Sequence, residues 1–214
     1  MKDWILKEDS FGSVRIHPTD SGVTVIRDTR TAAWWARWLA RRLARREAQA
    51  LQAAASLKGL PRLLDFDGCR LSRTFLPGEA MHEARPVSQA YFRDALTLLR
   101  RLHRCGVVHN DLAKEPNWLC LANGQPGLID FQLALVTPHR HALFRALARE
   151  DLRHLLKHKR TYVPQALTTR QRAILDRPSL LTRTWRALIK PAYLFITRKI
   201  LGWPERDGPA ERVR

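Results

Sequence analysis

The chain has 214 residues, and its 38 Lys or Arg outnumber its 20 Asp or Glu, which gives a formal net charge of +18. A hydrophobic share of 45% is enough for a buried core and excludes a disordered basic tail. Three cysteines with no CxxC spacing argue against a disulfide framework or a zinc module, and they favour a cytoplasmic compartment. We expect neither a signal peptide nor a membrane span, which would need about 18 consecutive apolar residues.

The positive charge indicates a polyanionic partner, because basic proteins attract nucleic acid, anionic membrane surfaces and anionic small molecules. The sequence contains no RGG repeat, basic homopolymer or zinc-finger spacing, so the charge alone does not select among these partners. A surface that is rich in arginine for reasons of composition alone is the other interpretation.

The first part of the chain is predicted to be rich in strands. Turn residues at 9–12 and 17–22 divide residues 4–28 into three strand-like runs. Residues 32–57 are rich in Ala, Leu and Arg and contain no Gly or Pro, which predicts a long helix. Residues 62–76 then predict a hairpin with an Asp-Gly turn.

The second part is predicted to be mainly helical. Residues 88–105 carry one apolar stripe with Gly106 directly after it, as in an amphipathic helix. Short apolar runs beside polar loops predict strands at 107–108, 118–121 and 128–129. Three further helices are predicted at 140–158, 168–176 and 181–201.

Two polar segments of the second part carry the candidate chemistry. The first reads His-Asn-Asp-Leu-Ala-Lys-Glu-Pro-Asn and holds Asp111, Lys114 and Asn117, and the second places Asp130 after a short apolar run. Phosphoryl transfer uses such a set of groups. One carboxylate orients the acceptor hydroxyl, a second carboxylate and an amide oxygen hold Mg²⁺, and a cation offsets the charge of the transferred phosphoryl group.

The two segments resemble the kinase catalytic loop H-x-D-L-x-x-x-N and the D-F-G metal site. In wording, the first segment is most similar to small bacterial kinase-like proteins, the RIO-type kinases and the lipopolysaccharide (Kdo/heptose) kinases. The resemblance implies an α+β, protein-kinase-like fold with a small β-rich N-lobe and a mainly helical C-lobe. It places the N-lobe at residues 1–78, the C-lobe with its catalytic and metal loops at 79–203, and a flexible tail at 204–214.

The resemblance also implies ATP and Mg²⁺ as cofactors, and it gives the loop residues roles. Asp111 would orient the acceptor hydroxyl, Lys114 would contact the transferred phosphoryl group, and Asn117 and Asp130 would hold Mg²⁺. For Lys114, an ordinary loop cation is the alternative.

Upstream, the same resemblance implies a cation on the third strand that pairs with a glutamate of the next helix. Arg27 and Glu47 fit these positions, although the family has Lys where this chain has Arg. Gly12 is the single glycine of a phosphate-covering loop that often contains three. The alternatives are a surface charge for Arg27 and a local ion pair for Glu47.

The loops depart from the family pattern in three places. Asn117 follows Asp111 by six residues, one more than usual, so the loop must bulge for the amide to reach the metal. Asn110 stands where the family has Arg, and Gln132 stands where D-F-G has Gly. Farther along, Asp151 either supports the backbone of the catalytic loop or lies on a solvated helix face.

The acceptor is predicted to be small and anionic. Only about twenty residues separate Asp130 from Asp151, and no A-P-E sequence follows, so little chain is available for a peptide-docking platform. We therefore expect a hydroxyl of an anionic sugar or glycolipid, such as a lipopolysaccharide-core precursor. The alternatives are a protein Ser/Thr kinase of RIO type, a pseudokinase, and an RNA-associated binding module that uses the charge.

Two segments that mix Trp with Arg, 34–42 and 185–195, could rest on an anionic bilayer. They could equally pack as core aromatics beside arginines that reach to solvent. The expected location is cytoplasmic, with peripheral association at the inner membrane as the alternative.

Overall fold

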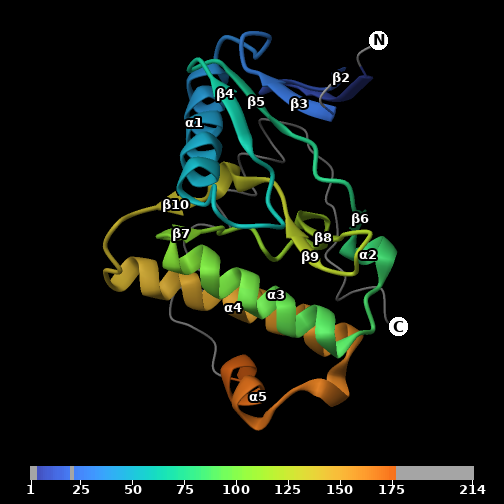
Figure 1. The fold of residues 1–214 in the computed structure, drawn as a ribbon. Coiled ribbons are helices and arrows are strands. Elements are labelled where there is room, and N and C mark those ends of the chain that lie inside the picture. Colours follow the sequence, from blue (N-terminus) through green and yellow to red (C-terminus); the bar gives the residue numbers. More distant parts are fainter. Residues whose placement is uncertain (1–3, 20–21, 177–214) are drawn as a thin grey trace. The chain divides into compact units, whose positions relative to one another are not determined.

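The computed structural model describes residues 4–19 and 22–176 (Figure 1). The chain divides into two compact units, Met1–Leu167 and Thr168–Arg214. The candidate site lies wholly in the first unit, and the predicted lobe boundary at residue 78 stays a prediction. In the second unit the predicted helix at 168–176 is confirmed as α5 (Thr169–Asp176). The predicted helix at 181–201 and the tail at 204–214 lie outside the described residues.

The N-terminal part of the first unit is an antiparallel sheet of five strands with the order β1-β2-β3-β5-β4. The strands are β1 (Trp4–Asp9), β2 (Gly12–Thr19), β3 (Gly22–Asp28), β4 (Leu63–Phe66) and β5 (Arg70–Thr74). The predicted strands and the hairpin are therefore confirmed. In the hairpin turn, Oδ1 of Asp67 accepts hydrogen bonds from the backbone amides of Cys69 and Arg70, at 2.8 and 2.7 Å.

The long helix α1 (Arg37–Ala53) connects β3 to β4. It begins five residues later than the sequence predicts, because residues 34–36 form turns instead. Its inward face is lined by small side chains, which let the helix lie close to its neighbours. The buried residues of this face, with Ala36 directly before the helix, are Ala36, Ala40, Ala44, Ala48 and Leu51. The helix contacts β4 and β5 of the sheet, and it also contacts the segment that follows Asp130.

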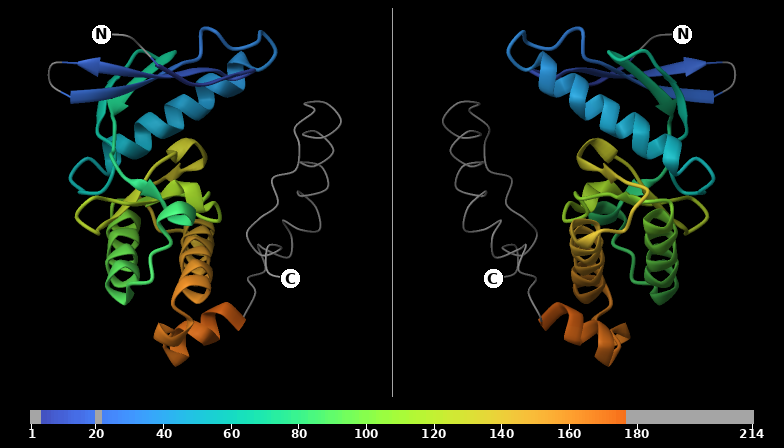
Figure 2. Two further views of the ribbon diagram at one scale, coloured as in Figure 1. Left: turned by 90° about the vertical axis from the view of Figure 1, so that its right-hand side faces the viewer. Right: turned by 90° about the vertical axis from the view of Figure 1, so that its left-hand side faces the viewer.

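The rest of the first unit is built on two helices, α3 and α4, which lie side by side (Figure 2). Both were predicted from apolar periodicity, although α4 extends four residues farther than expected. The helices of this part are α2 (Met81–Ala84), α3 (Gln89–Arg104), α4 (Ala142–Tyr162) and the short 3₁₀ turns η1 (Glu115–Asn117), η2 (Phe131–Leu133) and η3 (Pro164–Ala166). Its strands are β6 (Glu79–Ala80), β7 (Val107–Val108), β8 (Trp118–Cys120), β9 (Pro126–Leu128) and β10 (Leu135–Val136).

The core of this part continues directly beneath the polar loops. Leu112, Trp118 and Phe131, each with no exposed area, come from the two candidate segments themselves. They pack with Phe92 and Leu102 of α3 in one apolar cluster. Buried apolar side chains therefore lie close in sequence to the polar site residues in both loops, and their packing in the core holds the loop backbones in place. Across residues 4–19 and 22–176, no helix combines the length and the hydropathy that crossing a membrane requires.

Candidate active site

Two loops form the candidate site, and a short ladder of backbone pairing brings them together. In this ladder β7 pairs with β10, with Val108 opposite Leu135 and Val107 opposite Val136. The amide of Thr137 donates to the carbonyl of Gly106 at 2.9 Å. Gly106 has φ of 76°, and a Cβ at this position would lie 2.3 Å from the carbonyl oxygen of Thr137. The close approach of the two loops therefore requires glycine here.

Asp151 of α4 holds the backbone of the first loop. Its carboxylate accepts hydrogen bonds from the amides of His109 and Asn110, at 2.8 and 2.9 Å, and is 1% exposed. His103 of α3 adds a contact of 3.2 Å between Nε2 and Oδ2 of Asp151. The structure thus supports the first of the two interpretations of Asp151, because a solvated helix face would leave it exposed.

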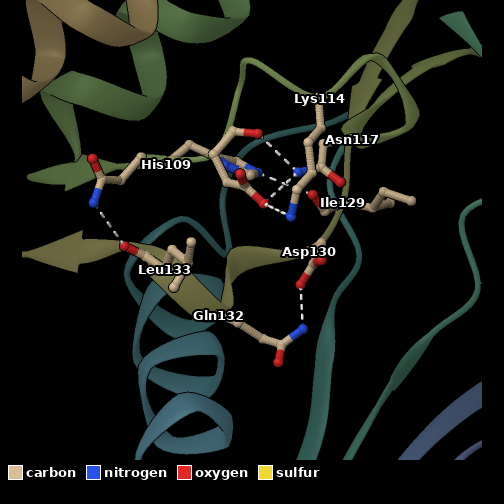
Figure 3. Close-up of polar contacts among 9 residues, drawn as sticks. His109, Lys114, Asn117, Ile129, Asp130, Gln132 and Leu133 are labelled. Carbon is tan, nitrogen blue, oxygen red and sulfur yellow. Dashed lines mark hydrogen bonds and ion pairs between the residues drawn. The ribbon is translucent and has the colours of Figure 1, made fainter. Parts of the chain in front are cut away.

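His109 connects the first loop to the second. Its Nε2 lies 2.9 Å from the carbonyl oxygen of Ile129 (Figure 3). Its ring packs against Phe131 with centroids 4.6 Å apart. The side chain has no exposed area. These contacts are those of a histidine that holds the two loops together.

Asn110 occupies a backbone conformation that explains its residue type. Its φ is 67°, in the left-handed region that Asn and Asp tolerate better than other residues with a Cβ. Its Nδ2 donates to the carbonyl oxygen of Leu133 at 3.4 Å. The position that holds Arg in the family pattern therefore makes a direct contact with the segment after Asp130.

The predicted catalytic residues of the first loop contact one another (Figure 3). Nζ of Lys114 donates to Oδ2 of Asp111 at 2.7 Å. Nδ2 of Asn117 donates to the same oxygen at 3.1 Å and to the Asp111 carbonyl at 2.9 Å. Because this pairing uses the amide nitrogen of Asn117, its amide oxygen is the atom that could bind a metal ion.

The extra residue between Asp111 and Asn117 is taken up by the 3₁₀ turn η1, as the expected bulge requires. Pro116 lies in the first positions of this turn, and the amide of Asn117 donates to the carbonyl of Lys114 at 3.2 Å. The carbonyl of Asn117 then accepts from the amide of Ile129 at 3.1 Å. The longer spacing therefore still places Asn117 between the two loops.

Glu115 anchors the turn from below. It is 5% exposed, accepts a hydrogen bond of 2.8 Å from the Tyr162 hydroxyl, and lies 3.6 Å from Nδ1 of His158. The contact with His158 lowers the pKa of Glu115, and the Tyr162 bond adds to this effect against the opposing effect of burial. Nε2 of His158 also lies 2.8 Å from the Leu112 carbonyl oxygen. This support could not be predicted from the sequence, because its members are about 45 residues apart.

Asp130 is in the left-handed conformation, with φ of 66°, and it is bonded to Gln132, whose Nε2 donates to Oδ1 (Figure 3). Burial by itself would raise the pKa of Asp130. The positive charge of Arg27, the Gln132 bond and the charge of Lys114 outweigh burial and hold the pKa below its usual value. Asp130 is therefore an ionised carboxylate at neutral pH, as a metal ligand requires.

The predicted pair of Arg27 and Glu47 forms between β3 and α1. Nε of Arg27 donates to Oε2 of Glu47 at 3.2 Å, and Glu47 is 1% exposed. The structure adds a residue that the sequence did not indicate, because Nε of Arg73 lies 3.0 Å from Oε1 of Glu47. Arg73 faces Val25 across the β3–β5 ladder, two positions from Arg27. Only the strand register brings these two arginines to one face.

Gly12 has a packing role in the turn between β1 and β2. Its φ is 115°, and a Cβ would lie 2.2 Å from the carbonyl oxygen of Asp28. The neighbouring Ser10 carbonyl accepts a hydrogen bond of 3.0 Å from the Ala33 amide. These contacts tie the turn to the end of β3, where Arg27 lies, and no bond joins Gly12 to the loop residues among those described.

The two loops therefore contribute the carboxylates of Asp111 and Asp130, the amide of Asn117 and the cation of Lys114. Within residues 4–19 and 22–176, no group of three or more His, Cys, Asp or Glu side chains could hold a metal ion by itself. Mg²⁺ differs from most metals in this respect, since one or two carboxylates commonly bind it together with substrate phosphates. The donors of Asn117 and Asp130 fit such a shared metal site.

Comparison with known proteins agrees with this geometry. The family model of the RIO domain matches residues 18–174. Two solved structures of the Rio2 kinase from Chaetomium thermophilum, one of them an ADP/Mg²⁺-phosphoaspartate complex, each match with a TM-score of 0.58 and 15% identity. The matches cover 82% of this chain but only 61% and 60% of the Rio2 chains. They confirm the predicted α+β, protein-kinase-like fold. No curated protein sequence matches the chain.

Proposed function

Because the chain belongs to the RIO domain family, we propose that it is an ATP- and Mg²⁺-dependent phosphotransferase located in the cytoplasm. The observation that carries the proposal is the arrangement of Asp111, Lys114 and Asn117 beside the ionised Asp130. A Rio2 structure that contains ADP and Mg²⁺ adds support for a nucleotide and this metal.

In this proposal each side chain of the site has a separate role. Asp111 orients the acceptor hydroxyl, and Lys114 fixes the Asp111 carboxylate and offsets phosphoryl charge. Asn117 and Asp130 hold Mg²⁺, which supplies charge neutralisation for the phosphates. Arg27 contacts the nucleotide phosphates, Glu47 keeps Arg27 in position, and Gly12 lets the β1–β2 turn approach the nucleotide.

We propose a hydroxyl of an anionic sugar or glycolipid, such as a lipopolysaccharide-core precursor, as the acceptor. The support is the short chain after Asp130, which turns back through η2 and pairs with β7 at Leu135. Helix α4 then begins at Ala142. This path offers little surface for a peptide, and the charge of +18 attracts anions.

A protein Ser/Thr kinase of RIO type is the second candidate, and the family match favours it directly. A pseudokinase is the third, because Arg27 stands where the family pattern has Lys. In that case the fold would bind nucleotide without turnover.

One experiment separates these candidates. The full chain is incubated with γ-labelled Mg-ATP and a lipid-A-type precursor, a generic protein substrate, or no acceptor, beside Asp111→Asn as the control. We expect label in the glycolipid, and none with Asp111→Asn. Label in the protein substrate alone would replace the glycolipid proposal with the RIO-type kinase. No transfer to any acceptor, with Mg-ATP binding retained, would establish the pseudokinase.

A further inference from the structure

The start of α1 and the turn before it expose large apolar side chains. Trp34 is 84% exposed, Trp38 71%, Trp35 50% and Leu39 40%. We use the name α1 patch for these residues together with the exposed arginines beside them. The members of the α1 patch are Trp34, Trp35, Arg37, Trp38, Leu39, Arg41 and Arg42. Of the two interpretations of the 34–42 segment, packing of its aromatics in the core is wrong for Trp34 and Trp38. The 185–195 segment lies outside the described residues.

The inward face of α1 is already fully occupied, which rules out a simple rotation of the helix to bury the patch. Ala40 and Ala44 are buried on that face, and so is Glu47, which bonds with Arg27. Trp38 of α1 and Trp34 of the turn before it are therefore left largely exposed, and Trp35 is half-exposed. Exposed apolar side chains gathered at one place commonly mark a contact surface.

The segment that carries the α1 patch has an excess of basic residues along the sequence, of which Arg30 is paired with Asp67. Between residues 30 and 62 the chain has eight basic residues and a single acidic one, Glu47. Glu47 is buried and contacts two arginines, so it does not offset the surface charge. The partner of the patch must therefore combine an apolar layer with negative charge.

We propose that the α1 patch docks on an anionic phospholipid membrane. Indole rings prefer the boundary between headgroups and acyl chains, where an apolar ring and a polar N–H are both satisfied. Arg42 lies over the Trp38 ring, 5.5 Å from its centroid. An aromatic ring and a positive charge are therefore next to each other on the same exposed surface. Anionic headgroups attract the arginines, and the aromatic side chains enter the interface.

A lipid surface explains the patch better than a nucleic acid does. Single-stranded nucleic acid is bound by aromatics inside a groove that follows the backbone. The α1 patch instead lies at the exposed start of α1 and on the turn before it. It also includes Leu39, an aliphatic side chain that enters a bilayer interface but forms no stacking platform for bases.

Docking would act on the helix that carries Glu47. A membrane that holds the first turns of α1 would also hold the partner of Arg27. This consequence rests on the proposed phosphotransferase function, whereas the docking itself does not.

The test uses the full chain without nucleotide and vesicles of phosphatidylcholine, with or without about 30% phosphatidylglycerol. The double variant Trp34→Ser/Trp38→Ser removes the two most exposed indoles. Trp4→Ser on β1 is the matched control, since Trp4 is 60% exposed outside the patch. Equal melting curves establish that each variant folds.

We expect wild type and Trp4→Ser to sediment with the anionic vesicles, and a blue shift of Trp emission that the double variant lacks. The double variant should bind at least about tenfold more weakly, and added salt should weaken the wild type. Equal binding by the double variant and wild type would overturn the proposal. The proposal would also be overturned if wild type did not bind vesicles but bound RNA, or associated with itself, and the double variant lost that binding or association. The vesicle experiment contains no ATP, so its outcome does not depend on whether the protein transfers phosphate.

Discussion

Arg73 of β5 and Glu47 of α1 form an ion pair of 3.0 Å that gives the buried carboxylate a second cation besides Arg27. The three side chains therefore bear one net positive charge next to the site. In the proposed phosphotransferase, Arg73 would keep Glu47 compensated while Arg27 contacts the nucleotide phosphates, and it would thereby help to position Arg27.

Substitutions of Arg73 and Arg27 should differ in their effects on the free energy of unfolding and on Mg-ATP binding. We expect Arg73→Gln to lower the free energy of unfolding by about 2 kcal/mol, because a buried carboxylate loses one of its two partners. Arg27→Gln should instead weaken Mg-ATP binding more than it lowers stability. Thermal melts with and without Mg-ATP measure both effects. Arg70→Gln, exposed on the same strand, is the control. A stronger effect of Arg73→Gln on nucleotide binding than of Arg27→Gln would contradict this division.

Mg-ATP should raise the melting temperature, and Asp130→Asn should largely remove the effect. A ligand at a hundred times its dissociation constant stabilises a protein by about 2.7 kcal/mol. Loss of the ionised carboxylate removes a metal ligand. Differential scanning fluorimetry at millimolar Mg-ATP checks this, with the exposed Asp65→Asn as the control. An unchanged melting curve for the wild type would count against the nucleotide site.

Asp111→Ala should abolish phosphate transfer and leave Mg-ATP binding nearly intact. Asp111 contacts Lys114 and Asn117 and is proposed to meet the acceptor, so its loss affects turnover rather than binding. Removal of such a group costs on the order of 10²–10⁴ in rate. Turnover and binding are measured on the same preparation. Equal rates for wild type and Asp111→Ala would show that the residue has another role.

Asp151→Asn should detach the first loop without removing α4. The amide nitrogen of Asn cannot accept a hydrogen bond, so either His109 or Asn110 loses the partner of its backbone amide. We expect a loss of about 1–3 kcal/mol in unfolding free energy and faster hydrogen exchange in the loop. Arg149→Gln, exposed on the same helix, serves as the control. Unchanged exchange at the two amides would contradict the anchoring role.

Stability should fall on mild acidification because of His154. Burial, with the charge of Lys157 as a smaller cause, lowers the pKa of His154 to about 4. Between pH 4 and about 6.5 the unfolded chain binds a proton that the folded chain does not, so the unfolding free energy decreases as the pH falls.

Between pH 6.5 and 4, His154 lowers the free energy of unfolding by roughly 3 kcal/mol at most. His154→Gln should flatten the profile of stability against pH between 4 and 6.5. The same substitution at the exposed His139 should leave the profile unchanged. Denaturant melts across this range provide the measurement, and parallel profiles for wild type and His154→Gln would rule out His154 as the cause.

The sequence predicted those parts of the fold and site that local residues determine. The strands, the Asp67 turn and helix α3 follow from short-range alternation and capping chemistry. Asp111, Asn117 and Asp130 were found because their spacing is a local motif. Their roles in metal and acceptor binding stay predictions that the variants above test.

Other features depend on contacts that a single sequence does not reveal. Arg73 joins the site through strand register, and Glu115 is held by residues of α4. Asp151 had two equal interpretations until its distance to the His109 amide was known. The exposure of Trp38 could not be predicted either, because the pattern of an amphipathic helix does not show whether a neighbour covers its second side.

The bond from Thr137 to Gly106 closes the second loop only seven residues after Asp130. Kinases that are switched by phosphorylation rely on a long stretch here that passes between ordered and disordered states. The loop is short in this chain. The glycine contact and the β7–β10 ladder hold its C-terminal end, and the bond from the Ile129 amide to the Asn117 carbonyl holds the residue before Asp130. For the proposed phosphotransferase, this leaves no long segment between Asp130 and Thr137 that could act as such a switch.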